Sequence, residues 1–258
     1  MTRSDFGIAI AEGVNRELGI EVRFVHEEDV LLIGPPSGTH ARLAVANFHA
    51  MHEQGKPIES LVAQIIAIHN QAASANTMTW DEVKDLAIPH VQHHPMPGLI
   101  KLREVSPILE TVAGIDGENS VALLTEDLLT RLGVSVDVFR AVADVNIERL
   151  LTENPGQEVT LETGRKFLVF ECGLAADLAY AFARKQPFAA VAFCSSDFAV
   201  VSDGRDMDAA AELTVIANVI AKRGLLHAMP PGVHLFANGE FSGLGAAIPL
   251  SAMTDLPN

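Results

Sequence analysis

The stretch Phe188–Gly204, FAAVAFCSSDFAVVSDG, holds two apolar runs separated by the short polar segment Cys194–Asp197. Runs rich in Val, Phe and Ala on either side of serines and an aspartate are typical of two β-strands joined by a turn. We therefore predict an antiparallel hairpin with strands over Ala189–Phe193 and Phe198–Val201. The polar segment lacks the glycine frame of a serine nucleophile elbow, so the pattern favours a turn over a catalytic site.

Helical patterns lie on both sides of this hairpin, over Ala175–Lys185 and Met207–Lys222. Strands are predicted before it, and hairpin patterns recur earlier in the chain at EVRFVHEEDVLLIG (Glu21–Gly34) and LETVAGIDGENSVALLT (Leu109–Thr125). Hairpins interspersed with helices predict an α+β fold, with a mostly antiparallel sheet on which the helices pack.

The N-terminal third is richer in helical patterns than the rest. Helices are predicted over residues 3–18, from Ala41, and over Ile58–Ala73, and a capping-box pattern at Thr79–Glu82 starts a short one. We therefore divide the chain into a helix-rich part with a β-hairpin, residues 1–87, and an α+β part, residues 88–258. No linker rich in Ser, Pro and Gly separates them, so one continuous domain is an open alternative.

The composition excludes several classes of protein. An apolar fraction of 48% is too high for an intrinsically disordered chain. The 33 acidic and 18 basic residues give a net charge of −15, which repels nucleic acid and suits a partner protein with a basic surface. No apolar run approaches the roughly 18 residues of a membrane span. The apolar run Phe6–Ala11 is too short for a signal-peptide core, so we expect a cytoplasmic protein.

Cys172 and Cys194 each lie in an apolar segment. Free thiols in such segments are usually buried, so we expect two buried cysteines.

The segment HAMHE (His49–Glu53) places His49, His52 and Glu53 on one side of a predicted helix. Two imidazoles and a carboxylate are ligands that zinc accepts. Their order, however, matches neither of the zinc-hydrolase arrangements HExxH and HxxEH. Histidines at the end of a helix also interact favourably with its dipole, so a structural role is favoured over a metal site.

A second group of histidines lies in IPHVQHHPMP (Ile88–Pro97). On a helix His90 and His94 would be neighbours, but prolines favour extended chain before them. On a strand the two rings share a face about 13 Å apart, at ~3.3 Å per residue, which is too far for one ion. We expect extended, partly exposed histidines here; a metal site that combines them with His49 and His52 stays open.

Two asparagines lie among apolar residues on predicted helix faces. Asn47 accompanies Leu43, Phe48 and Met51, and Asn146 lies in the helix predicted from Val136. A buried carboxamide costs roughly 1–3 kcal/mol unless its polar atoms are paired. We interpret both as structural asparagines bonded to a neighbouring backbone, and a ligand contact is the alternative.

The segment GVSVDVFRAVADVNIERL (Gly133–Leu150) resembles bacterial proteins classed as domain of unknown function 1444. Similar stretches follow the same order elsewhere, at FVHEEDVLLIG, ANFHAMHEQ, AIPHVQ and FAAVAFCSSDFAVVSDG. The resemblance covers most of the chain and implies an α+β fold without implying a particular activity. It also implies that Phe48, His49 and His52 occupy positions where the family has aromatic or apolar packing residues.

These observations favour a cytosolic, non-catalytic binding or regulatory protein that acts through protein–protein contacts and needs no cofactor. The alternative from a different class is a metal-dependent hydrolase that uses the N-terminal histidines and a divalent metal such as zinc. A structural homodimer built through strand edges is a third hypothesis.

Overall fold

The computed structural model describes residues 1–27, 29–34, 41–75, 77–94, 98–117, 121–222, 229 and 232–245; of residues 41, 42, 44, 47, 71–75, 221 and 222 it describes the backbone. The chain forms two compact units, Met1–Thr77 and a second unit made of Met78–Gly117 and Val121–Asn258. Both combine helices with antiparallel sheet, which confirms the predicted α+β class.

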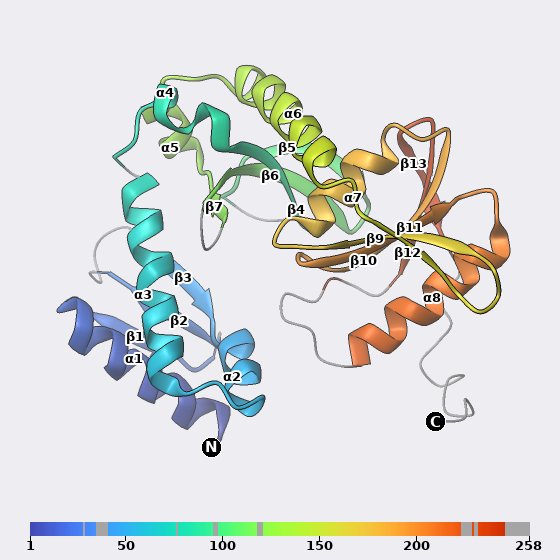
Figure 1. Ribbon diagram of the computed structural model, residues 1–258. Helices are drawn as coiled ribbons and strands as arrows, with labels where there is room; N and C mark the ends of the chain where they lie inside the picture. The colour runs from blue at the N-terminus through green and yellow to red at the C-terminus, as the bar shows by residue number, and fades with distance from the viewer. Residues whose placement is uncertain are drawn as a thin grey trace. The chain divides into compact units, whose positions relative to one another are not determined.

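The first unit packs helices on a three-stranded sheet of order β1-β2-β3 (Figure 1). Its elements are α1 (Arg3–Leu18), β1 (Val22–Val25), β2 (Val30–Ile33), β3 (Ala41–Ala44), α2 (Val45–Glu53) and α3 (Ile58–Ala75). In α1 the residues Phe6, Ile10 and Val14 recur at helical spacing and are fully buried. They form one core with Leu31 of β2 and Ile65 of α3.

The helix predicted from Ala41 is wrong at its start, because β3 precedes α2 there. Ala41 pairs with Ile33 and Ala44 with Val30 in an antiparallel ladder. Alanine and leucine favour helix intrinsically, but that preference is worth only a few tenths of a kcal/mol per residue. Pairing with β2 satisfies the backbone groups along that side of β2, and this tertiary interaction overrides the local propensity.

The described part of the second unit contains two antiparallel sheets. A four-stranded sheet has the order β4-β6-β5, with β7 also paired to β6, and a six-stranded sheet has the order β13-β12-β10-β11-β9-β8. The strands of the first sheet are β4 (Ala87–His93), β5 (Lys101–Ser106), β6 (Leu109–Asp116) and β7 (Val121–Leu123). Those of the second are β8 (Gln157–Thr160), β9 (Lys166–Glu171), β10 (Phe188–Ser195), β11 (Phe198–Asp203), β12 (Val233–Ala237) and β13 (Glu240–Leu244).

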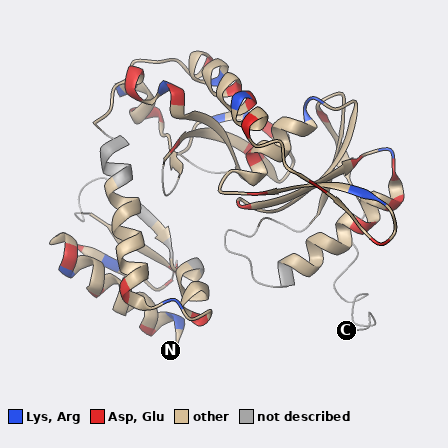
Figure 2. Ribbon diagram, viewed as in Figure 1, with Lys and Arg blue, Asp and Glu red and all other residues tan. Residues whose placement is uncertain are grey.

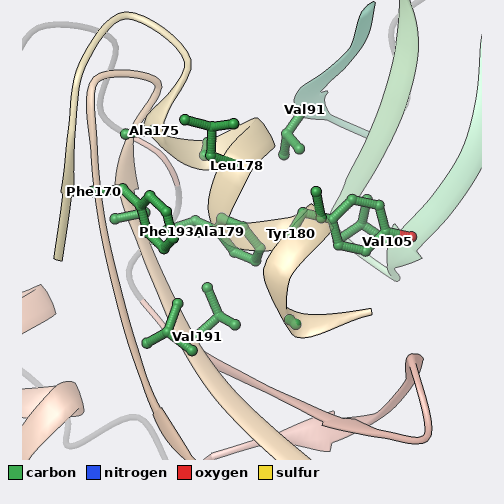
Figure 3. Close-up of a cluster of buried hydrophobic side chains, with 14 of the residues drawn as sticks. Val91, Val105, Phe170, Ala175, Leu178, Ala179, Tyr180, Val191 and Phe193 are labelled. Atoms are coloured by element: carbon green, nitrogen blue, oxygen red, sulfur yellow. The ribbon is translucent and has the colours of Figure 1, made fainter. Parts of the chain in front are cut away.

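The helices of this unit are α4 (Trp80–Val83), the 3-10 turn η1 (Lys84–Leu86), α5 (Glu126–Leu132), α6 (Val136–Glu153), α7 (Ala175–Ala183) and α8 (Met207–Lys222). Helix α7 contributes to a core shared by both sheets. Leu178 of α7 packs in one cluster with Val91 and Val105 of the four-stranded sheet and with Val191 and Phe193 of the six-stranded sheet (Figure 3).

The opposite face of the six-stranded sheet is covered by α8 (Figure 1). Ala190 and Ala192 of β10 are fully buried there against Leu213 and Ala217 of α8. Small side chains on a sheet let a helix approach closely, so the alanine-rich β10 can be covered on both faces. The hairpin predicted from Phe188–Gly204 is confirmed as β10 and β11.

The two units divide at Thr77, earlier in the chain than the boundary predicted at residue 87. Helix α4 belongs with the second unit because Val83 is fully buried in a core cluster of that unit. The Trp80 ring also lies 5.7 Å from the ring of Phe139 in α6.

Among the helices that the structure describes, none combines the length and apolarity needed to cross a membrane.

Candidate functional site

Helix α1 and strand β1 approach each other closely because α1 carries a glycine at the crossing. A Cβ atom placed on Gly7 would lie 2.8 Å from two ring atoms of Phe24. The missing side chain therefore lets the Phe24 ring pack directly against the helix backbone. Any larger residue at position 7 would force either the Phe24 ring or α1 to move.

Among the described strands, β1 forms one edge of its sheet, and its backbone groups divide into those that face β2 and those that face outward. The amide of Gly34 donates to the carbonyl oxygen of Glu21 at 3.0 Å. Bonded and non-bonded positions alternate in an antiparallel ladder, so every second residue from Glu21 onward directs its backbone groups to β2. Val22 and Phe24, at the intervening positions, direct theirs to the outer side of the sheet.

An open groove of about 790 Å³ lies between α1 and β1. Its lining is Ile8, Ala11, Glu12, Asn15 and Arg16 from α1 and Val22, Arg23 and Phe24 from β1. Ile8 is a large apolar side chain that stays 48% exposed at this place. The groove thus combines an apolar floor with a polar rim beside an edge strand.

The rim of the groove carries charge of both signs. Arg16 and Arg23 supply guanidinium groups, and Glu12 supplies a carboxylate. Arg23 Nε lies 3.2 Å from a carboxylate oxygen of Glu21, and both side chains are about half exposed. An ion pair exposed to this degree contributes little to stability, so both groups can exchange partners at low cost.

The metal candidates of the first unit make local contacts with the backbone. His49 Nε2 donates to the carbonyl oxygen of Met1 at 3.3 Å, and His52 Nδ1 donates to that of Lys56 at 3.0 Å. Both rings lie against the ring of Phe6, at centroid distances of 5.2 and 5.3 Å. A carboxylate oxygen of Glu53 lies 3.8 Å from His49 Nδ1. These bonds engage one nitrogen of each ring with a carbonyl.

His90 forms a buried pair with Asp177 inside the second unit. Its Nδ1 donates to Asp177 Oδ2 at 2.9 Å, and the amide of Val91 donates to Asp177 Oδ1 at 2.6 Å. Asp177 lies in the first turn of α7, where the helix dipole favours a carboxylate. It thereby satisfies an outward amide of β4, an edge strand of the four-stranded sheet.

The environment of this pair shifts two pKa values. Burial lowers the pKa of His90, but the charge and hydrogen bond of Asp177 outweigh it, and the pKa ends above its ordinary value. Burial and the nearby Asp177 carboxylate raise the pKa of Asp116. His90 was expected to be partly exposed; it is buried instead, because Asp177 of α7 closes over the strand edge.

His94 follows β4 and pairs with a different carboxylate. Its Nδ1 donates to Glu110 Oε2 at 2.6 Å, and the Glu110 side chain is buried while His94 is one-third exposed. Lys101 Nζ lies 3.8 Å from the same oxygen of Glu110. His90 and His94 therefore each belong to a separate carboxylate pair.

The described residues contain no group of three or more His, Cys, Asp and Glu side chains arranged to hold a metal ion. His49, His52 and Glu53 belong to the first unit, and His90 and His94 belong to the second. The metal-dependent hydrolase stays a prediction that a measurement of bound metal would test.

Asn146 is buried on the face of α6 that meets the turn before β4. Its Nδ2 donates to the carbonyl oxygens of Lys84 at 2.7 Å and Ala87 at 2.9 Å. One amide group thus satisfies two backbone acceptors, one in η1 and one at the first residue of β4. The side chain of Asn47 lies outside the part of the chain whose side chains are described.

The two cysteines differ in exposure. Cys194 is buried at the end of β10, and burial raises the pKa of its thiol to about 12. Cys172 is exposed, which corrects the expectation that both thiols are buried. It follows the last residue of β9, where the chain leaves the sheet and turns toward α7. Although the residue is exposed, its sulfur is partly shielded from water, and this shielding raises the pKa of Cys172, as do the carboxylates of Asp177 and Asp197.

Comparisons with protein-family models, with curated proteins and with solved structures found no match to this chain. The resemblance to domain of unknown function 1444 therefore stays a prediction.

The groove between α1 and β1 was not predicted from the sequence. The hairpin pattern of β1 and β2 was visible, but it does not tell which strand is the sheet edge. One signal was available in α1: Gly7 lies within an otherwise helical pattern, and such a glycine often marks a close backbone approach.

Proposed function

We propose that the chain is a non-catalytic binding protein, and that the groove between α1 and β1 holds an extended segment of a partner protein. The observation that carries this proposal is the coincidence of two features: an apolar groove and the edge of β1, whose outward backbone groups border it. We also propose that the protein is located in the cytoplasm.

The expected mode of binding is strand addition. An extended segment placed beside β1 would bond through its main chain to the outward N–H and C=O groups of Val22 and Phe24. Main-chain hydrogen bonds contribute affinity that does not depend on the sequence of the bound segment. The side chains of that segment that alternate toward the groove contribute selectivity. Ile8 and Ala11 offer the apolar contact for those side chains.

Charge adds a second level of selectivity. Arg16 and Arg23 flank the groove and favour a segment that carries a carboxylate at the matching position. The chain as a whole has a net charge of −15, and Figure 2 shows acidic residues on both units. A partner with a basic surface around such a segment would associate faster at low ionic strength.

The experiment selects displayed random peptides against the full chain and measures their affinities by fluorescence polarisation. The selected peptides should alternate apolar and polar residues and include an acidic side chain. Ile8→Glu places a charge in the groove at an exposed position and should weaken binding about tenfold or more, since burial of an unpaired charge is costly.

Val145→Glu is the matched control, because Val145 is an apolar side chain of α6, 68% exposed and outside the lining of the groove. It should bind the selected peptides as tightly as the native chain. Equal weakening by both substitutions, or by neither, would contradict the proposal. Light scattering of the peptide-free protein distinguishes a partner segment from a second copy that pairs through β1.

A further inference from the structure

Strands β9 and β11 of the six-stranded sheet separate at one end. Their register runs from Phe198 opposite Glu171 to Val201 opposite Leu168 and stops there. β9 continues its pairing with β8 as far as Lys166, and β11 continues its pairing with β10 as far as Asp203. Beyond Val201 and Leu168 the two strands are no longer paired, while each keeps its other partner. This end of the β9–β11 pair is called the fork.

Two glycines fix the segments that border this fork. A Cβ atom on Gly156, which has a φ of +82°, would lie 2.9 Å from Leu168 Cγ. A Cβ atom on Gly204 would lie 2.8 Å from the backbone nitrogen of Ala189. The chain just before β8 therefore packs closely on the Leu168 side chain, and the turn after β11 packs closely on the backbone of β10.

A pocket of about 390 Å³ occupies the fork, within the range of roughly 300–1,000 Å³ usual for small-molecule sites. Its apolar lining includes Leu168, Phe182, Val201 and the prolines 155 and 187. Phe188 is 44% exposed, although it begins a strand whose other residues are buried. An exposed aromatic ring in a pocket wall offers a stacking surface to a flat ligand.

Two oppositely charged pairs line the same pocket. Lys166 Nζ lies 2.7 Å from a carboxylate oxygen of Glu158. Arg205 donates to Asp203 through Nε and Nη2, at 3.0 and 2.6 Å. Its guanidinium carbon also lies 6.0 Å from the centroid of the Phe188 ring. Each cation keeps further N–H donors, and each carboxylate keeps further lone pairs.

We propose that this fork pocket binds a small aromatic zwitterion, such as an amino acid with an aromatic side chain. The ring stacks on Phe188 between the apolar walls, the ligand carboxylate bonds to Arg205 or Lys166, and its ammonium bonds to Asp203 or Glu158. The lining carries two positive and two negative groups, so a ligand with both charges meets a partner for each. A ligand with only a negative charge would leave the two carboxylates of the lining without a counterpart, and a ligand with only a positive charge would leave the two cationic groups without one.

Four probes are titrated separately into the full chain, and binding is monitored by the chemical shifts of backbone amides in NMR spectra. L-phenylalanine carries all three features, 3-phenylpropanoate lacks the ammonium, 2-phenylethylamine lacks the carboxylate, and L-alanine lacks the ring. L-phenylalanine should shift the amides of Phe188, Ser202 and Arg205 saturably. It should bind about tenfold or more tightly than each other probe, since each lacks one stabilising interaction.

Phe188→Leu and Arg205→Gln should each weaken L-phenylalanine binding about tenfold. The control is Arg149→Gln, which removes an exposed guanidinium of α6 outside the pocket lining and should bind as the native chain. Thermal unfolding of each variant checks that it is folded. Equal affinity for all four probes, absence of saturable shifts, or native affinity in the folded Phe188→Leu variant would overturn the proposal.

Discussion

The Nδ1 atom of His90 lies 2.9 Å from Oδ2 of Asp177, although the two residues are 87 positions apart in the chain. Both side chains are buried, so the pair links β4 to the first turn of α7 in a place that water reaches poorly. A buried ion pair contributes little relative to apolar residues, but removal of one partner leaves the other uncompensated.

Asp177→Ala should therefore destabilise the chain by about 3–5 kcal/mol, because it leaves His90 and the Val91 amide without their acceptor. Asp208, an exposed acid in the first turn of α8, provides the control. Asp208→Ala should change the free energy of unfolding by less than about 1 kcal/mol. Chemical denaturation of both variants measures the difference, and similar midpoints would contradict the assigned role of Asp177.

The His90 pair should also make stability depend on pH. The pKa of His90 is raised in the folded chain, so its protonated form contributes stability that is complete below the unfolded pKa of about 6.5. This contribution is lost as the pH rises through the folded pKa. The free energy lost in His90→Gln should thus be larger near about pH 6 than near about pH 9. A loss that grows with pH would reverse the sign and refute the assignment.

His234 should make the stability of the fold depend on pH in the opposite direction. It is fully buried in β12, its ring lies 5.1 Å from that of Phe193, and neither ring nitrogen has a hydrogen-bond partner among the described residues. Burial lowers the pKa of His234 to about 4. The unfolded chain takes up the proton first, so stability falls as the pH drops from about 6.5 toward that value.

His234→Phe should therefore keep or raise stability at neutral pH and reduce the loss on acidification. Thermal unfolding between neutral and acidic pH measures both. The same acid sensitivity in native chain and variant would show that other groups cause it.

Asn146→Ala should cost roughly 1–3 kcal/mol, because the carbonyl oxygens of Lys84 and Ala87 lose their donor. Asn146→Leu should be no better, since added apolar volume leaves those two acceptors unpaired. Glu148→Ala is the control on the same helix: Glu148 is exposed, 3.6 Å from Lys185, and its removal should cost within about 0.5 kcal/mol. Equal denaturation midpoints for Asn146→Ala and Glu148→Ala would contradict the role of Asn146.

Local sequence patterns predicted most of the helices and strands but not which of them pair or pack together. Hairpins and amphipathic helices depend on neighbours within a few residues, so β10, β11 and α6 could be predicted. Strand β3 could not, because its formation depends on the register with β2 rather than on the preference of Ala41 for a helix.

The candidate sites were harder to predict for the same reason. Asp177 of α7 meets His90 of β4, 87 positions earlier in the chain, and no local periodicity connects such distant positions. The groove beside β1 depends on which strand forms the edge and on the close approach at Gly7. The burial of Asn146 followed from its helical face, whereas its acceptors on Lys84 and Ala87 depend on tertiary packing.

Amide hydrogen exchange along β1 tests the central claim most directly. In the peptide-free chain the amides of Val22 and Phe24 should exchange faster than those of Arg23 and Val25, because the latter pair with β2. A bound peptide from the selection should slow Val22 and Phe24 and leave Arg23 and Val25 little changed. Outward amides that are already protected in the free chain, or that stay unprotected in the complex, would contradict strand addition at this edge.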